Sequence, residues 1–193
     1  RIVGYPDSEG LVCYRNFFGI WPKTEINIEV LSALINSPLL NAALFSKGYG
    51  RYNHADTLEQ IPVPFANPID NVKVTELVRH YGALRVQLDK DIHREAVIQE
   101  CIITLYKIDA LILKAYDLSP KFERTLLEFF RGYKRPLPFE FPDYYPADFK
   151  PYIPLYKFIE MDLKQASAGE LLRKIAPFDS EDIHEFVLAL ERR

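Results

Sequence analysis

Side chains suited to binding a nucleic acid gather in one short polar segment of this sequence, residues 47–54. Two glycines there allow a backbone to approach a phosphate group closely, and Lys47 and Arg51 supply positive charge. Arg51 and Asn53 carry groups that form paired hydrogen bonds with base edges. The candidate contact residues are Lys47, Tyr49, Arg51, Tyr52, Asn53 and His54. We predict a binding loop, and the alternative is an ordinary polar connector between a helix and a strand.

Sequence signatures of the common enzyme classes are absent. The chain has no glycine-rich phosphate loop, no Gly-x-Ser-x-Gly, no His-Glu-x-x-His and no Cys-x-x-Cys. Its four histidines are scattered, and none has a second ligand one helical turn away, so we predict no metal site. Cys13 and Cys101 lie far apart in apolar surroundings, which indicates two reduced core residues.

One segment resembles the signature of a metal-dependent nuclease, with Pro142-Asp143 followed by Asp148-Phe149-Lys150. That chemistry needs two acids on neighbouring strands to hold a divalent cation, with the lysine beside them. Only four residues, one of them a proline, separate the two aspartates. We therefore favour a strap rich in proline and aromatic residues over 133–154, in which both aspartates begin turns.

The charge balance limits the classes of partner. The 193 residues include 24 Lys and Arg against 27 Asp and Glu, a net charge of -3, and 48% of them are hydrophobic. This composition excludes a disordered tail and a strongly basic arm, so any contact with nucleic acid must be local or shared with another domain. Without a signal-peptide pattern or a long apolar run, we expect a soluble cytoplasmic protein with no membrane contact. Because the only methionine is Met161, we expect a piece of a longer chain.

The first third of the chain predicts both strands and helices. Residues 11–22 are rich in aromatic residues that favour strands, and 57–64 predicts a short strand at a sheet edge. Between them, apolar residues recur at helical spacing over 24–45, and Ser37-Pro38 predicts a break into two short helices. We therefore predict an α+β fold, in which a small mixed sheet with flanking helices forms residues 1–68.

Long helices are predicted beyond residue 68. Two amphipathic helices form an antiparallel pair that meets near Asp89 to Arg94, and Ser119-Pro120 begins another helix that runs to Gly132. The two apolar faces are Val74, Leu77, Val78, Tyr81, Leu84 and Leu88, then Ile98, Ile102, Leu105, Ile108, Leu111, Ile112 and Ala115. Residues 69–132 are thus a helical spacer. Residues 133–193 are the strap and a mainly helical C-terminal part with short helices at 155–164, 168–175 and 180–190.

Several sequence segments occur in an order that is similar to a known family. They run from Arg15-Asn-Phe-Phe-Gly-Ile-Trp-Pro22, through Asn36-Ser-Pro-Leu39 on a helix and Gly50-Arg51, to Ile61-Pro-Val-Pro64 and a spacer ending in Ile108-Asp…Tyr116-Asp-Leu118. Over about residues 1–130, this set resembles the C-terminal target-recognition region of Taq-type and fused restriction-modification N6-adenine DNA methyltransferases. The remaining residues, 131–193, show no similarity to this family from which a mechanism could be inferred.

The resemblance implies a division of labour. This chain lacks the Asn-Pro-Pro-Tyr signature, which holds a flipped adenine in that family. It also lacks a glycine motif that would bind a cofactor. An upstream domain would therefore bind S-adenosylmethionine and transfer the methyl group, while this chain, without a cofactor or catalytic residue of its own, selects the site on double-stranded DNA. Further contact candidates under this resemblance are Arg15, Asn16 and Lys23. Neither the DNA sequence nor the oligomeric state follows from it.

Two other functions stay open at the level of sequence. The negative net charge and the amphipathic helices also fit a protein-interaction module of a larger bacterial protein, without direct DNA contact. A small nuclease is the third possibility, and it depends on the Asp143 to Lys150 segment alone.

Overall fold

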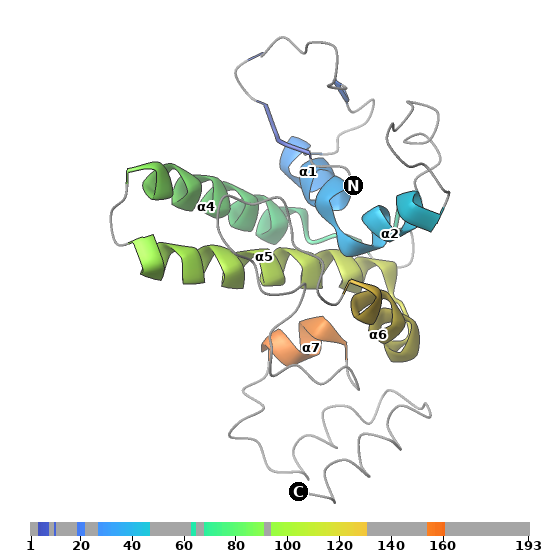
Figure 1. Ribbon diagram of the computed structural model, residues 1–193. Coiled ribbons are helices and arrows are strands. Elements are labelled where there is room, and N and C mark those ends of the chain that lie inside the picture. The colour runs from blue at the N-terminus through green and yellow to red at the C-terminus, as the bar shows by residue number, and fades with distance from the viewer. Residues whose placement is uncertain are drawn as a thin grey trace, which may run out of the picture.

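The computed structural model describes residues 4–7, 10, 19–21, 27–46, 63–64, 68–90, 94–130 and 154–160. In these ranges the chain forms helices and no strand. The helices are α1 (Ile28–Asn36), α2 (Pro38–Ser46), α4 (Asn71–Asp89), α5 (Arg94–Tyr116), α6 (Pro120–Phe129) and α7 (Leu155–Glu160), as Figure 1 shows.

The predicted α+β fold with a small mixed sheet is wrong, because the described part of the chain is helical without a strand. The structure describes only positions 19–21 and 63–64 of the two predicted strands. These positions do not pair with any neighbouring strand. Strand propensity depends on packing against neighbouring strands more than on the residue type. Pro22, Pro62 and Pro64 also remove backbone donors that a ladder needs. Aromatic content alone was therefore a poor guide to a sheet.

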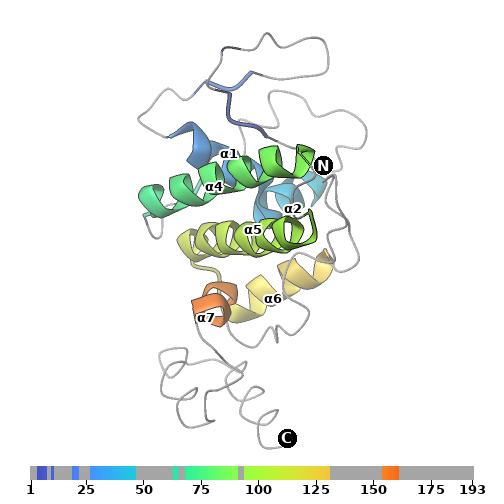
Figure 2. The same cartoon turned by 90° about the vertical axis from the view of Figure 1, so that its left-hand side faces the viewer.

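Helix α5 lies in the middle of the described structure. Figures 1 and 2 show α4 and α1 on one side of it and α6 and α7 on the other. The adjacent residues Ile112 and Leu113 are 0% and 1% exposed, although their side chains point about 100° apart. A helix that is buried on more than one face needs apolar residues around most of its circumference. This explains why apolar residues predominate in α5 from Cys101 to Ala115.

Two hydrophobic clusters attach the other helices to α5. One joins α1 to the hairpin through Val30, Ala33, Leu34, Val74, Ile108 and Ile112. The other joins the far end of α4 to α5 through Leu84, Leu88, Val97, Cys101, Ile102 and Tyr106, with Ile159 of α7 packed against it. The predicted apolar faces are confirmed in outline, because their members are buried or half-buried. Cys101 is a buried free cysteine, as predicted, and Cys13 lies outside the described residues.

The predicted helical pair is confirmed, with α4 ending at Asp89 and α5 beginning at Arg94. The Asp70 carboxylate caps α4 by accepting a hydrogen bond from Lys73 N at 3.0 Å. At the other end of the pair, α5 stops at Asp117, whose φ of 50° is the left-handed conformation typical of a helix terminus. Its N–H donates to Lys114 O at 3.2 Å and so satisfies one of the last carbonyls of α5.

The start of α6 follows the predicted capping pattern. Ser119 Oγ accepts a hydrogen bond from Phe122 N at 3.5 Å, and proline occupies the first turn. The helix ends at Phe129 rather than at the predicted Gly132, and Phe130 is its C-terminal cap. Of the predicted C-terminal helices, α7 falls within 155–164, and the segments 168–175 and 180–190 lie outside the described residues.

In the part of the chain that the structure describes, no single helix is long and apolar enough to span a membrane. The pair α1 and α2 passes the same length and composition test only when the two are taken together across a bend of 55°. Their apolar side chains include the buried residues Val30, Leu34, Leu40 and Leu44, which pack in the interior.

The core at the α1–α4–α5 junction gives a direct stability test. We expect Val74→Ala to lower the free energy of unfolding by about 2 kcal/mol, because Val74 is 0% exposed and its loss leaves a cavity. Val72→Ala, two residues away on the same helix, is the matched control, since Val72 is 71% exposed. Urea unfolding of both variants measures the difference, and equal destabilisation would contradict this packing.

Candidate functional site

The predicted contact residues all fall outside the residues that the structure describes. They are Arg15, Asn16, Lys23, Lys47, Tyr49, Arg51, Tyr52, Asn53 and His54. The nuclease-like residues Asp143, Asp148 and Lys150 lie outside them as well. The structure therefore neither brings these side chains together nor separates them. What it does describe is the framework from which the 47–54 segment begins.

A sharp corner between α1 and α2 forms this framework. Ser37 is fully buried there, and its Oγ accepts a hydrogen bond from Leu40 N at 3.3 Å, so that it caps α2. The Asn41 amide donates to Ile35 O at 3.2 Å and to Ser37 O at 3.0 Å, and so connects the last turn of α1 to the first turn of α2. The predicted break at Ser37-Pro38 is thus confirmed. Local hydrogen bonds fix the direction in which α2 leaves α1.

The last turn of α1 also binds the beginning of the chain. Asn36 Nδ2 donates to Gly4 O at 2.8 Å, and Asn36 Oδ1 accepts from Gly4 N at 3.2 Å. Ser32 Oγ donates to the same Gly4 carbonyl at 3.3 Å. The asparagine amide therefore pairs with both backbone groups of one residue, much as a neighbouring strand would. The motif that contains Asn36 does not by itself indicate this anchoring role, because Gly4 lies 32 positions away in the sequence.

Gly4 and Gly82 provide a matched test of this anchor. A Cβ at Gly4 would lie 3.0 Å from Ile35 Cγ2 and 3.3 Å from Ile35 Cβ, whereas a Cβ at Gly82 would meet nothing within 4 Å. We expect Gly82→Ala to raise the free energy of unfolding by about 0.5–1 kcal/mol through helix propensity. Gly4→Ala should give no such gain and should lower stability by displacing Ile35. Thermal unfolding distinguishes them, and stabilisation by both substitutions would contradict the anchor.

An ion pair connects α1 to α4. Arg79 Nε lies 2.7 Å from Glu29 Oε1, and the Glu29 side chain is about 10% exposed while that of Arg79 is 69% exposed. Burial alone raises the pKa of Glu29, but the hydrogen bond and charge of Arg79, together with a backbone hydrogen bond, outweigh it, so the pKa lies below its usual value. Next to the pair, Asn27 Nδ2 donates to Thr75 Oγ1 at 2.9 Å. These polar contacts fix the N-terminal half of α1 on α4.

Removal of Arg79 tests this electrostatic contact. We expect Arg79→Gln to cost about 1–3 kcal/mol at neutral pH, because it leaves the buried Glu29 carboxylate without a cation and Oε2 already has no hydrogen-bond partner among the described residues. The i,i+4 pair of Arg124 and Glu128 is the control, and Glu128→Gln, at a side chain that is 43% exposed, should cost at most about 0.5 kcal/mol.

The pH dependence adds an independent readout. In the native chain the Glu29 pKa is lowered, so its contribution to stability is present above the unfolded pKa of about 4.5 and is lost as pH falls through the folded value. In Arg79→Gln the effect of burial on the Glu29 pKa dominates and raises it. Acidification should then increase the stability of the variant, because protonation removes the cost of a buried, unpaired carboxylate. Chemical unfolding at neutral and acidic pH gives both slopes. The same slope in both proteins would show that Arg79 does not control the Glu29 carboxyl.

The C-terminal end of α2 reaches the surface just before the predicted contact segment. Phe45 is 62% exposed and the next residue, Ser46, is exposed as well. The Phe45 ring packs edge-on against Phe129 of α6, with the ring centroids 5.3 Å apart, and Phe129 packs similarly on Phe130. Phe122 lies two turns earlier on α6 and is 68% exposed. Phe45 and Phe129 are thus in contact, and helical spacing places the exposed Phe122 on the same face of α6. We refer to these three exposed rings as the aromatic surface.

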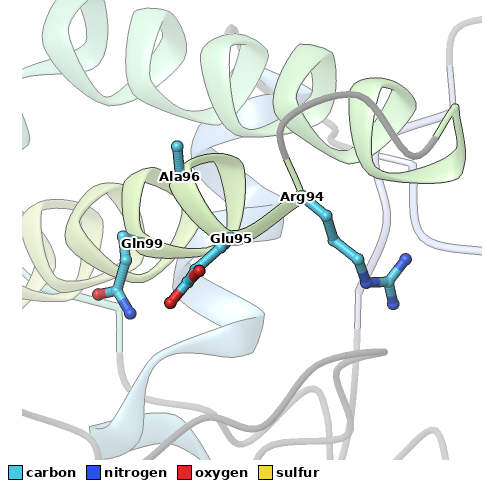
Figure 3. A pocket seen from close by; sticks show the side chains of 4 residues that line it. All are labelled: Arg94, Glu95, Ala96 and Gln99. Atoms are coloured by element: carbon cyan, nitrogen blue, oxygen red, sulfur yellow. The ribbon is translucent and has the colours of Figure 1, made fainter.

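Other polar groups do not form a catalytic arrangement in the described ranges. Figure 3 shows a shallow depression at the start of α5, where Arg94 extends away from Glu95 and Gln99, so the side chains do not converge. His80 Nε2 lies 2.9 Å from Glu100 Oε1 in an exposed pair between α4 and α5. Among the described residues, no group of three or more His, Cys, Asp or Glu side chains is placed to hold a metal ion.

Comparison with protein-family models, curated proteins and solved structures finds no match to this chain.

Proposed function

We propose that this chain is the specificity part of a bacterial adenine-N6 DNA methyltransferase or restriction-modification enzyme and that it recognises a sequence in double-stranded DNA. The observation that carries the proposal is the ordered run of family-like segments from Arg15 to Leu118. Two features of the structure support it. The Asn36-Ser37-Pro38 segment forms the end of one helix and the start of the next, and a helical hairpin suited to a spacer follows Ile61 to Pro64.

The proposed recognition depends on a segment that follows a hydrogen-bonded corner between two helices. The α1–α2 corner fixes α2 through the Ser37 and Asn41 hydrogen bonds, and α2 ends at the exposed Ser46, next to Lys47. Lys47 and Arg51 would neutralise phosphates or read guanine edges, at about 1–3 kcal/mol of discrimination for a good bidentate contact. Since the net charge of the chain is -3, affinity must come from such local contacts.

Under this proposal, methyl transfer belongs to an upstream domain. That domain would bind S-adenosylmethionine and extrude the target adenine from the duplex. The present sequence has neither Asn-Pro-Pro-Tyr nor a glycine motif that would cradle the cofactor. The chain's own task is then to set where on the duplex the upstream domain acts.

The second candidate function is a protein-interaction module without DNA contact. The aromatic surface favours it, because three exposed rings from α2 and α6 lie on a chain of negative net charge. Exposed apolar groups of this kind commonly mark contacts between proteins. The two functions differ in how binding to DNA responds to salt.

Salt titration of duplex binding tests the DNA proposal. The purified chain is titrated against a duplex pool with a randomised centre, and we expect affinity to fall steeply as salt rises. Loss of one phosphate contact in Lys47→Ala should lower the slope of log K against log salt by about 0.9. Arg51→Ala should cost about 1–3 kcal/mol of binding if Arg51 reads a base.

Lys73→Ala is the matched control, because it removes one exposed positive charge from the first turn of α4. It should leave affinity and salt slope nearly unchanged. Negligible duplex binding by the unchanged chain at low salt would overturn the DNA proposal and favour the interaction module. Equal effects of Lys73→Ala and Arg51→Ala would show nonspecific attraction rather than recognition.

A further inference from the structure

Glu123 is a buried acid that the proposed function does not use. It lies in the first turn of α6 and is 3% exposed. Its Oε1 accepts a 2.6 Å hydrogen bond from Leu155 N, 32 residues later in the chain. Leu155 is the first residue of α7 and is itself 0% exposed. One carboxyl group therefore connects the start of α7 directly to α6.

The other polar contacts of α7 that involve described residues are near the surface. Lys114 Nζ of α5 lies 3.9 Å from Glu160 Oε1, and both side chains are nearly half exposed. The same ammonium group lies 4.9 Å from the centroid of the Tyr156 ring, and Lys157 Nζ lies 5.2 Å from it. Exposed pairs of this kind contribute little to stability. The buried Glu123 bond and the apolar contacts of α7 are thus its main attachments.

Among the residues that the structure describes, no charged group near Glu123 is paired with its carboxylate. On the packed elements they are Lys114, Tyr116 and Asp117 of the α5 end, Lys121, Arg124 and Glu128 of α6, and Tyr156, Lys157 and Glu160 of α7. Helix α2, which also packs on α6, carries no charged side chain. Lys114 and Lys157 lie over the Tyr156 ring, and Arg124 pairs with Glu128. Among these groups, no cation is paired with the Glu123 carboxyl.

We propose that Glu123 is a proton-controlled latch for α7, which holds α7 against α5 and α6 when the carboxyl is neutral and releases it when the carboxyl ionises. A neutral carboxyl can accept the Leu155 N–H without burying a net charge. An ionised carboxyl would have to stay in a buried site where, among the described residues, one backbone donor compensates it, whereas undocking of α7 returns it to water.

The titration range of the latch lies close to neutral pH. Burial raises the pKa of Glu123 to about 7, and the Leu155 N–H opposes this shift only in part. Because the docked state holds the proton more tightly than the undocked state, docking is strongest below the ordinary pKa of 4.5 and weakens as pH rises through about 7. If undocking restores an ordinary pKa, the docking equilibrium constant falls by up to about 300-fold over this range.

Hydrogen exchange of the α7 amides tests the latch in the intact chain. Protection factors, which correct for the intrinsic rate, are compared at about pH 5.5 and about pH 8.5. We expect protection of residues 155–160 to fall by about 30-fold between these two pH values, because about tenfold of the total loss already lies below pH 5.5, while that of the α5 amides stays unchanged. In Glu123→Gln the amide oxygen still accepts the Leu155 N–H, so protection should not depend on pH. Glu128→Gln, an exposed acid on the same helix, should behave like the unchanged protein.

Two outcomes would overturn the proposal. One is equal protection of α7 at both pH values in the unchanged protein, and the other is the same loss of protection in Glu123→Gln. A direct titration of the Glu123 carboxyl by carbon NMR in the unchanged protein decides the matter even if the glutamine variant does not fold. An ordinary pKa near 4.5 in that titration would exclude the latch, whereas a value near 7 coupled to shifts in the α7 signals would support it.

Discussion

Burial of α5 on opposite sides is the constraint on which the rest of the described structure depends. Residues in the middle and last turns of α5, from Cys101 to Ala115, contact α1 and α4 on one side and α7 on the other. Each neighbouring helix needs only one apolar stripe to pack on it, whereas α5 must be apolar on several faces. The polar interactions then act at the edges of this assembly. They fix the corner before α2, the N-terminal half of α1 and the first turn of α7.

The sequence was informative where helical spacing and capping residues agreed. The structure has all three predicted boundaries, at Ser37-Pro38, Asp89 to Arg94 and Ser119-Pro120. The first and last follow from proline geometry and serine caps, which act over a few residues. The prediction of a sheet was wrong because it depended on distant rather than local contacts. A strand depends on partners far away in the chain, and aromatic residues near Trp21 carry no information about whether such partners exist.

The described polar anchors were not predictable from local pattern. Asn36 binds Gly4 across 32 positions, and Arg79 binds Glu29 across 50. Nothing in the neighbouring sequence indicates such partners. The burial of Glu123 is partly indicated by the sequence, since Leu127 and Phe130 follow it at helical spacing and place it on the buried face of α6. The residues proposed to contact DNA, from Arg15 to His54, remain a prediction from residue type and family likeness.

The seam between α4 and α5 has a practical consequence through Cys101. Its thiol is 0% exposed, and burial raises its pKa, an effect that nearby Arg85 opposes and Glu100 reinforces. A thiol that is both shielded and protonated reacts slowly with alkylating reagents. The modification rate measured at Cys101 itself, separately from that of Cys13, therefore reports opening of the contact between the two long helices without an engineered label.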